Sequence, residues 1–145
     1  MKTLKITSLV LVMVLAVAAC SNDDGSGQTA GGDGADEATA DSGYTVLDPA
    51  SLQQMMQEED VYLVNVHVPY EGELPDTDAF IPYTEITSRM DELPFGEQTV
   101  VIYCRSGSMS TEAAQAMVAA GAPPFYELGG GWYSWQGAGL PFEVN

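Results

Sequence analysis

The chain is poor in basic residues and has no lysine beyond its fifth position. Its 145 residues include 21 acidic side chains and four basic ones, so the formal net charge is −17 at pH 7. Lys2 and Lys5 lie at the N-terminus, which leaves Arg89 and Arg105 as the cations of the remaining chain. Nucleic-acid binding needs clustered cations that displace counterions from phosphates. The composition therefore excludes nucleic acid as an expected partner, and it argues against electrostatic attraction to anionic lipid.

The excess of acidic residues has two explanations, and the sequence leaves both open. One is a host rich in salt, because at about 1 M salt the screening length falls to about 3 Å and repulsion between like charges is largely screened. The other is an acidic surface on an ordinary extracellular protein.

Long apolar runs are absent except at the N-terminus. There, a short basic region is followed by a continuous apolar run that ends at Ala19. A bilayer-spanning helix needs about 20 apolar residues, and this run is shorter. Residues 1–19 are therefore predicted to be a signal peptide, and the lack of a twin-arginine pair favours export in the unfolded state.

Cysteine is scarce, and the first of the two cysteines follows the signal peptide directly. The residues around it, Val17-Ala18-Ala19-Cys20, resemble the lipobox of bacterial lipoproteins. The resemblance implies cleavage before Cys20, lipidation of its sulfur, and a cell membrane lipoprotein that faces outside the cytoplasm. The alternative is ordinary secretion, with cleavage at a nearby small residue and Cys20 left free or removed.

The segment after Cys20 lacks any apolar side chain larger than alanine. Residues 20–43 contain six glycines and six acidic residues. Such a segment cannot bury enough surface to offset the entropy of ordering it, so we predict a disordered acidic, glycine-rich linker. The folded part is then a single small domain at residues 44–145, which we expect to be a monomer.

The domain alternates short apolar runs with amphipathic segments. Asp48 and Pro49 are typical of a helix start, and further helices are predicted at 86–93, at a segment capped by Ser110 or Thr111 and stopped by Gly121, and within 129–141. Strands are predicted at 61–66, 99–104 and 124–128. This alternation predicts an α/β fold with a central, mainly parallel sheet flanked by helices on both faces.

The second cysteine, Cys104, lies where the strand at 99–104 meets the following helix. At the carboxyl end of a parallel strand, a helix N-terminus presents free backbone N–H groups and a positive dipole end, which favour a thiolate or an oxyanion. Gly107 and the serines around it let the loop curl tightly. The alternative is that Cys104 is a small buried hydrophobic residue that ends a strand.

Other cysteine chemistries fit this loop less well. A protein tyrosine phosphatase needs an arginine six residues after the cysteine, where this chain has Ser110, and it has Tyr103 rather than histidine before the cysteine. A cysteine protease needs a histidine base, for which His67 is the single candidate. What remains is sulfur transfer, in which one thiolate carries a sulfane sulfur as a persulfide. We expect neither a metal ion nor a cofactor.

The stretch Cys-Arg-Ser-Gly-Ser-Met-Ser that begins at Cys104 resembles the active-site loop of rhodanese domains, the thiosulfate sulfurtransferase family. The likeness extends over about residues 44–143, with Pro69 and Glu71 matching after an early strand. The closing segment matches at Leu128, Gly130, Trp135 and Gly139 to Pro141.

The resemblance implies that Cys104 is the nucleophile that forms the persulfide. It implies that backbone N–H groups of the loop surround the sulfur. It also implies that Arg105 supplies one cation for an anionic sulfur donor. The implied substrates are a small sulfur donor (thiosulfate, polysulfide or persulfide) and a thiol or cyanide acceptor. The implied substrate-binding residues are Arg105, Ser106, Gly107, Ser108, Met109 and Ser110.

The chain departs from the family pattern at several positions. Asn65 and His67 stand where the family usually has Asp-x-Arg, and Ser108 and Met109 stand where active members often carry a cation. Met109 indicates that the entrance of the predicted sulfur site carries less charge, which suits a persulfide, a polysulfide or a protein thiol as substrate. His67 is either an auxiliary residue that acts on the loop or a structural hydrogen-bonding residue.

Two further groups have a functional and a structural interpretation. Glu71, Asp76 and Asp78 either bind a cation or form a solvated face, and we favour the solvated face. Trp132 and Trp135 are expected in the core with Tyr133 at its rim, the alternative being an aromatic lip around the sulfur site.

Two classes of function therefore stay open. The first is a cell-surface sulfurtransferase that passes sulfane sulfur from Cys104 to a thiophilic acceptor. The second is a catalytically weak rhodanese-like module that binds a partner or senses redox change by reversible oxidation of Cys104.

Overall fold

The computed structural model describes residues 43–144. The predicted signal peptide, the predicted lipidation of Cys20 and the predicted linker up to residue 42 lie outside these residues. No helix between residues 43 and 144 is long and apolar enough to cross a membrane. In chain order the elements are β1 (Tyr44–Leu47), α1 (Pro49–Glu58), β2 (Val61–Asn65), β3 (Ala79–Phe80), the 3-10 helix η1 (Ile86–Glu92), β4 (Thr99–Tyr103), α2 (Ser108–Ala119), β5 (Phe125–Leu128) and α3 (Gly131–Gly137).

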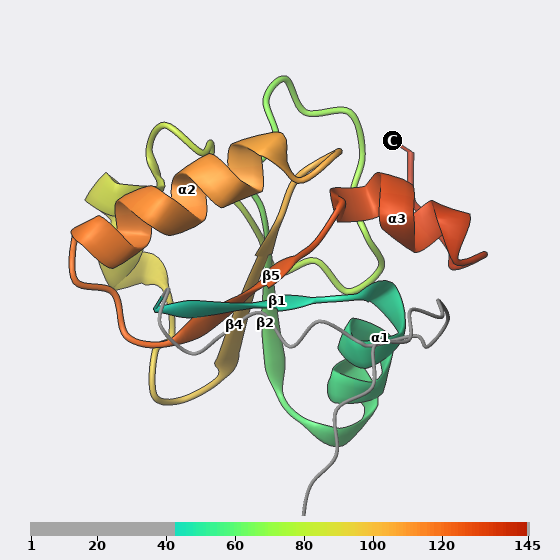
Figure 1. The fold of residues 1–145 in the computed structure, drawn as a ribbon, viewed down its shortest axis with the longest axis horizontal. Coiled ribbons are helices and arrows are strands. Elements are labelled where there is room, and N and C mark those ends of the chain that lie inside the picture. Colours follow the sequence, from blue (N-terminus) through green and yellow to red (C-terminus); the bar gives the residue numbers. More distant parts are fainter. Residues whose placement is uncertain (1–42, 145) are drawn as a thin grey trace, which may run out of the picture. The chain divides into compact units, whose positions relative to one another are not determined.

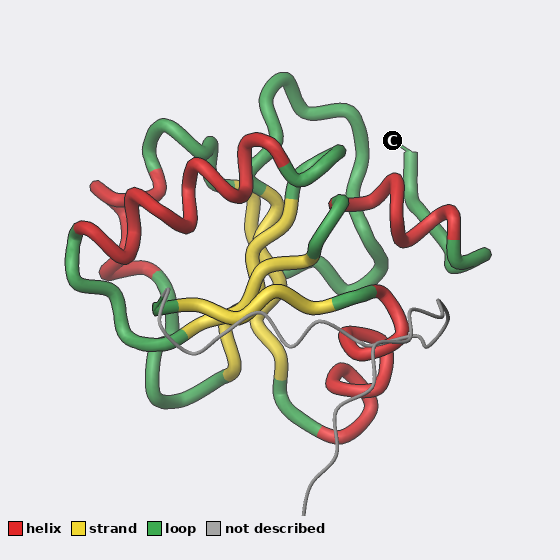
Figure 2. Tube along the Cα trace, viewed as in Figure 1, coloured by secondary structure: helices red, strands yellow, loops and turns green. Residues whose placement is uncertain are grey.

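The strands form one parallel sheet with the order β1-β5-β4-β2-β3. Figure 2 shows the strands in yellow between the helical segments in red. β4 occupies the centre, paired with β2 over its whole length and with β5 on its other side. The predicted parallel sheet is confirmed, and its central strand is the one that leads into Cys104.

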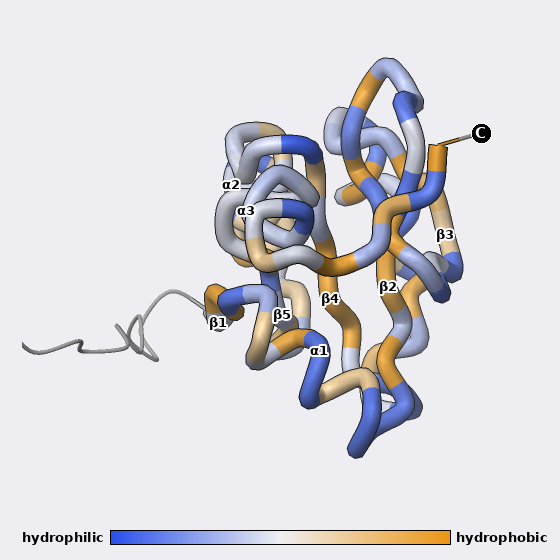
Figure 3. Tube along the Cα trace, turned by 90° about the vertical axis from the view of Figure 1, so that its right-hand side faces the viewer, coloured by the Kyte–Doolittle hydropathy of each residue, from blue (hydrophilic) through white to orange (hydrophobic). Residues whose placement is uncertain are grey.

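Helices cover both faces of this sheet, as predicted. Figure 1 shows α1 and α2 on opposite sides of the strands. On one face, Leu52 of α1 and the tryptophans of α3 pack on Leu63 and Val101. On the other face, Met117 of α2 and residues of η1 pack on the alternate strand positions. Burial on both faces explains why β2 and β4 are hydrophobic along most of their length (Figure 3).

The start of α1 agrees with the sequence. Asp48 is the N-cap, its carboxylate accepts a hydrogen bond of 2.8 Å from the amide of Ser51, and Pro49 is the first helical residue. This bond lowers the pKa of Asp48, because the carboxylate is the form that accepts it. Leu52 is fully buried, while Met55 and Met56 pack partly buried beside it.

Two strands were not predicted from the sequence. β1 has four residues and pairs only with β5, and β3 has two residues and pairs only with β2. Edge strands this short carry little periodic signal, since their extended conformation depends on hydrogen bonds from a neighbour distant in sequence.

Candidate functional site

The thiol of Cys104 lies at the carboxyl end of the central strand. Its side chain is buried, with the residue 1% exposed, and it packs with the core on the α2 side of the sheet. The amide of Gly107 donates a hydrogen bond of 3.1 Å to Sγ. A backbone N–H aimed at the sulfur from the N-cap of a helix stabilises negative charge there.

The helix behind the cysteine begins earlier than predicted. α2 starts at Ser108 with Gly107 as its N-cap, so the prediction that Ser110 or Thr111 caps it is wrong. Gly107 has a φ of 93°, a left-handed conformation that glycine adopts without steric cost. This conformation turns the chain from the loop into the helix, and it leaves both hydroxyls inside the first turn. The predicted stop is confirmed, because α2 ends at Ala119 and Gly121 has a φ of 83°.

The turn between β5 and α3 supports the cysteine loop from the other side. The amide of Trp132 donates to the carbonyl of Cys104 at 3.0 Å, and the amide of Tyr133 donates to that of Arg105 at 3.1 Å. Gly131, with a φ of 58°, lies so close that a Cβ there would collide with the Cys104 carbonyl oxygen. Only glycine fits this position, because backbone meets backbone.

Arg105, the residue after the cysteine, is held by a carboxylate. Its Nη1 donates to Glu71 Oε2 at 2.8 Å, and its guanidinium lies 5.9 Å from the centre of the Tyr133 ring. The side chains of Arg105 and Glu71 are 41% and 40% exposed. The cation expected to attract an anionic donor is therefore already paired.

His67 reaches the loop through the same carboxylate. Its Nε2 lies 3.0 Å from Glu71 Oε2 and donates to it, since an ionised carboxylate only accepts. These hydrogen bonds, from His67 first and then from Arg105, lower the pKa of Glu71. Glu71 is exposed, as expected of a solvated face, and it also lies between the only histidine and the loop arginine.

The His67 ring is buried and fixed by its surroundings. It is 2% exposed, packs edge-on against Trp132 with ring centres 4.9 Å apart, and its backbone amide donates to Asn65 Oδ1 at 2.9 Å. Its Nδ1 is buried, with no hydrogen-bond partner among the described residues. The sulfur of Cys104 receives its hydrogen bond from Gly107, whereas His67 is connected to the loop through Glu71, which also binds Arg105.

A buried acid, Glu127, lies under the first turn of α2 and was missed by the sequence analysis. It is 2% exposed, and its Oε1 lies 2.6 Å from Ser110 Oγ and 2.8 Å from Thr111 Oγ1. Burial raises the pKa of Glu127, and the two hydroxyls oppose this rise. The available signal was its position in a strand, because Glu127 shares a face with buried Phe125 two residues earlier.

The remaining loop residues differ in exposure. Ser106 and Ser108 are exposed, Met109 is partly buried against the core that includes Cys104, and Ser110 is buried. Ser110 Oγ also lies 3.1 Å from the carbonyl oxygen of Gly107, which ties the helix start to the cysteine loop.

The aromatic residues of α3 lie as predicted. Trp132 and Trp135 are each 3% exposed in the core, and Tyr133 is 56% exposed. In the acidic loop, Asp78 accepts a hydrogen bond of 2.8 Å from the amide of Leu63, which gives this carboxylate a structural role. Within residues 43–144, no group of three or more metal-ligating side chains could hold a metal ion.

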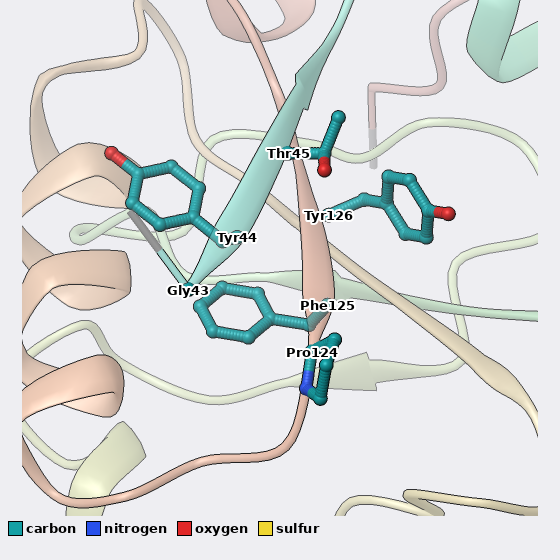
Figure 4. Close-up of a pocket in the computed structure, with 6 residues that line it drawn as sticks. All are labelled: Gly43, Tyr44, Thr45, Pro124, Phe125 and Tyr126. Carbon is teal, nitrogen blue, oxygen red and sulfur yellow. The ribbon is translucent and has the colours of Figure 1, made fainter. Parts of the chain in front are cut away.

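A separate pocket of about 230 Å³ lies at the amino ends of β1 and β5 (Figure 4). The rings of Tyr44 and Phe125 stack there with centres 5.5 Å apart. Because the strands are parallel, this end of the sheet is opposite to the end that carries Cys104. The pocket is lined by Gly43, Tyr44, Thr45, Pro124, Phe125 and Tyr126.

The chain is similar to a family of rhodanese-like domains and to proteins named sulfurtransferase. Residues 48–138 match the family described as the Rhodanese-like domain. A protein named sulfurtransferase from Allochromatium vinosum is 38% identical over 99 residues, which are 66% of this chain and 91% of that protein. The thiosulfate sulfurtransferase GlpE of Vibrio cholerae is 29% identical over 101 residues, which are 68% of this chain and 94% of that protein.

Solved structures are similar in fold. A rhodanese-related protein from Thermoplasma volcanium has a TM-score of 0.58 at 20% identity, covering 69% of this chain and 98% of its own. The rhodanese-like domain of an Anabaena protein has a TM-score of 0.59 at 19% identity, covering 68% of this chain and 78% of its own. At these identities the likeness concerns the fold alone, and it confirms the predicted small α/β domain.

Proposed function

Because the chain belongs to the rhodanese-like family, we propose that it is a sulfurtransferase that carries sulfane sulfur as a persulfide on Cys104. The observation that carries the proposal is the geometry at Cys104. A single thiol follows the central strand, its sulfur accepts a hydrogen bond from the Gly107 amide, and the first turn of α2 begins beside it. Relatives named sulfurtransferase support a sulfur-transfer role at the level of the family.

In the first step, the Cys104 thiolate attacks the outer sulfur of a donor. With thiosulfate, a new S–S bond forms to Cys104, the S–S bond of the donor breaks, and sulfite leaves with the bonding electron pair. The product is a Cys104 persulfide, whose outer sulfur carries the negative charge. The Gly107 amide and the start of α2 stabilise the thiolate before the attack.

In the second step, an acceptor thiolate attacks the outer sulfur of the persulfide. The S–S bond to Cys104 breaks, the acceptor leaves as a persulfide, and the Cys104 thiolate is regenerated. Cyanide reacts in the same way and leaves as thiocyanate. Neither step consumes an oxidant or a reductant, so one cysteine is sufficient for a full cycle.

Mass spectrometry of the donor-treated protein tests this function. Treatment with thiosulfate or an organic persulfide should add one sulfur atom to the peptide that contains Cys104, and Cys104→Ser should abolish both the added mass and turnover. Cys20→Ser is the matched control, because it removes the other cysteine and should leave the modification intact. No added sulfur with either donor would refute the proposal.

A second candidate function is a rhodanese-like module that senses redox change or binds a partner. Two observations favour it: the thiol is only 1% exposed, and Arg105 is paired with Glu71. Under this alternative, peroxide should convert Cys104 reversibly to a sulfenate or a mixed disulfide, whereas sulfur donors should leave its mass unchanged.

The proposed location is the outer side of the cell membrane, with lipidated Cys20 as the anchor and the sequence resemblance to a lipobox as its support. Fractionation of cells that produce the chain should place it in the membrane fraction. Cys20→Ser should move it to the soluble fraction, and an unchanged distribution would contradict lipidation at this residue.

A further inference from the structure

The mouth of the proposed sulfur site contains a cation that is already neutralised. Arg105 Nη1 and Glu71 Oε2 are 2.8 Å apart, and the lowered pKa of Glu71 keeps this carboxylate charged. An anion that approaches the Cys104 loop therefore meets a positive and a negative charge together. The pair lies at the surface, so its own contribution to stability is small, but its effect on an incoming charged ligand is direct.

The Glu71 carboxylate is also held at this position by a buried residue. The oxygen that accepts from Arg105 also accepts from His67 Nε2 at 3.0 Å. His67 is buried against Trp132, and its backbone is fixed by Asn65. Glu71 cannot swing away from Arg105 without losing its bond to a buried ring, so an anionic substrate does not simply displace it.

We propose that Glu71 determines the class of sulfur donor, by disfavouring dianionic thiosulfate and favouring an organic persulfide that carries at most one negative charge. This inference rests on the proposed sulfurtransferase function. Thiosulfate needs an uncompensated cation to offset its two charges, and Arg105 is the only arginine or lysine in the loop. A persulfide of a small uncharged thiol does not depend on such a cation, and the partly buried Met109 offers it an uncharged neighbour.

The reaction with this donor is balanced without another reagent. The Cys104 thiolate attacks the outer sulfur of R–S–SH and forms an S–S bond. The S–S bond of the donor breaks, the thiolate RS⁻ leaves, and the Cys104 persulfide is formed. Glu71 does not touch the reacting atoms in this scheme, so its role is to set the charge that the donor meets.

The decisive experiment compares single-turnover rates of persulfide formation on Cys104 with thiosulfate and with the persulfide of 2-mercaptoethanol. In the wild-type chain, the rate ratio of thiosulfate to organic persulfide should be lower than the same ratio for free cysteine. Glu71→Gln keeps the shape of the side chain and removes its charge. It should raise the ratio about tenfold, since a unit charge acts on a dianion at short range.

Two further variants show whether the effect passes through Arg105. In the double variant Glu71→Gln/Arg105→Gln the increase in the rate ratio should disappear, because the cation that Glu71 neutralises is no longer present. Asp76→Asn removes the same charge from the same exposed loop, outside the Arg105 pair, and should change the ratio less than twofold. Circular dichroism confirms that each variant is folded.

The outcomes separate this inference from the proposed function. If neither donor adds sulfur to Cys104, the sulfurtransferase function fails and the inference fails with it. If both donors react but the rate ratio of thiosulfate to organic persulfide is not lower for the wild-type chain than for free cysteine, only the role of Glu71 is overturned. This wild-type comparison needs no variant, so it holds even if Glu71→Gln does not fold. The role of Glu71 is also overturned if the increase in the rate ratio persists in the double variant, or if Asp76→Asn gives the same increase.

Discussion

At the scale of single residues, the cysteine loop depends on glycines whose roles differ. Gly107 supplies a left-handed turn and an amide for the sulfur, whereas Gly131 supplies space for the Cys104 carbonyl. The sequence predicted the first role, because Gly107 lies between a cysteine and a helix in the same short stretch. The second role was not predictable, since the atoms that would clash belong to a different loop.

Gly131→Ala should destabilise the domain strongly. The added Cβ would meet the backbone of Cys104 and Arg105, and its left-handed φ disfavours any side chain. We expect a loss of about 3 kcal/mol in the free energy of unfolding, measured by urea denaturation. Gly137→Ala in the same helix is the control, since a Cβ there meets nothing within 4 Å. Equal stabilities of the two variants would contradict the packing argument.

At the scale of elements, β5 and α2 are joined by a buried carboxyl group. Ser110 Oγ lies within hydrogen-bond distance of both Glu127 and the Gly107 carbonyl, yet a hydroxyl has one hydrogen to donate. Ser110 Oγ and Thr111 Oγ1 donate to Glu127 Oε1 at 2.6 Å and 2.8 Å, so this side chain bridges β5 to the first turn of α2. Burial raises the pKa of Glu127 and the two hydroxyl donors oppose this rise, so the ionisation of a β5 residue is linked to the start of the helix behind the cysteine loop.

The stability of the domain should therefore depend on the ionisation of Glu127. Burial raises its pKa above the unfolded value, so its stabilising contribution is complete below the unfolded pKa and is lost as the pH rises through the folded pKa. Glu127→Gln stays neutral. Its Tm relative to wild type should increase between about pH 4 and pH 8, as measured by thermal unfolding.

An exposed carboxylate on the same helix provides the comparison for this series. Glu112→Gln removes a charge from the surface of α2, and the pH dependence of its relative Tm should be smaller. If the Tm difference between Glu127→Gln and wild type is constant over the pH range, the argument that folding raises the pKa of Glu127 is refuted.

At the scale of the whole molecule, the acidic charge is opposed by very few cations. Both arginines of residues 43–144 form ion pairs, Arg89 with Glu85 and Glu92, and Arg105 with Glu71. These pairs leave most of the acidic side chains to repel one another through solvent. Such repulsion destabilises the compact state, and mobile ions screen it.

The domain should therefore become more stable as salt is added. Raising NaCl from about 0.1 M to about 1 M should increase the free energy of unfolding by about 1 kcal/mol, which corresponds to a rise of about 5 °C in Tm. KCl at the same ionic strength should give a similar curve, because screening depends on charge rather than on ion identity. A Tm that falls or stays constant in both salts would refute the argument.

The sequence by itself determined the features that depend on neighbours along the chain. Asp48 and Pro49 start a helix, apolar runs form strands covered on both faces, and Cys104 follows one of these runs just before a helix. Each of these is a local pattern, because capping, periodicity and turn chemistry act over a few residues. Local patterns are therefore sufficient to predict Cys104 and its loop as the candidate site.

Only the tertiary structure decided which charged groups meet at that loop. Glu71 lies 34 residues before Arg105, and Glu127 lies 17 residues after Ser110, yet each pair is within hydrogen-bond distance. The parallel sheet brings the carboxyl ends of β2, β4 and β5 to one edge, and no periodic pattern states which side chains will touch there. The sequence thus placed Cys104, the proposed nucleophile, while the order of the strands decided the charges that surround it.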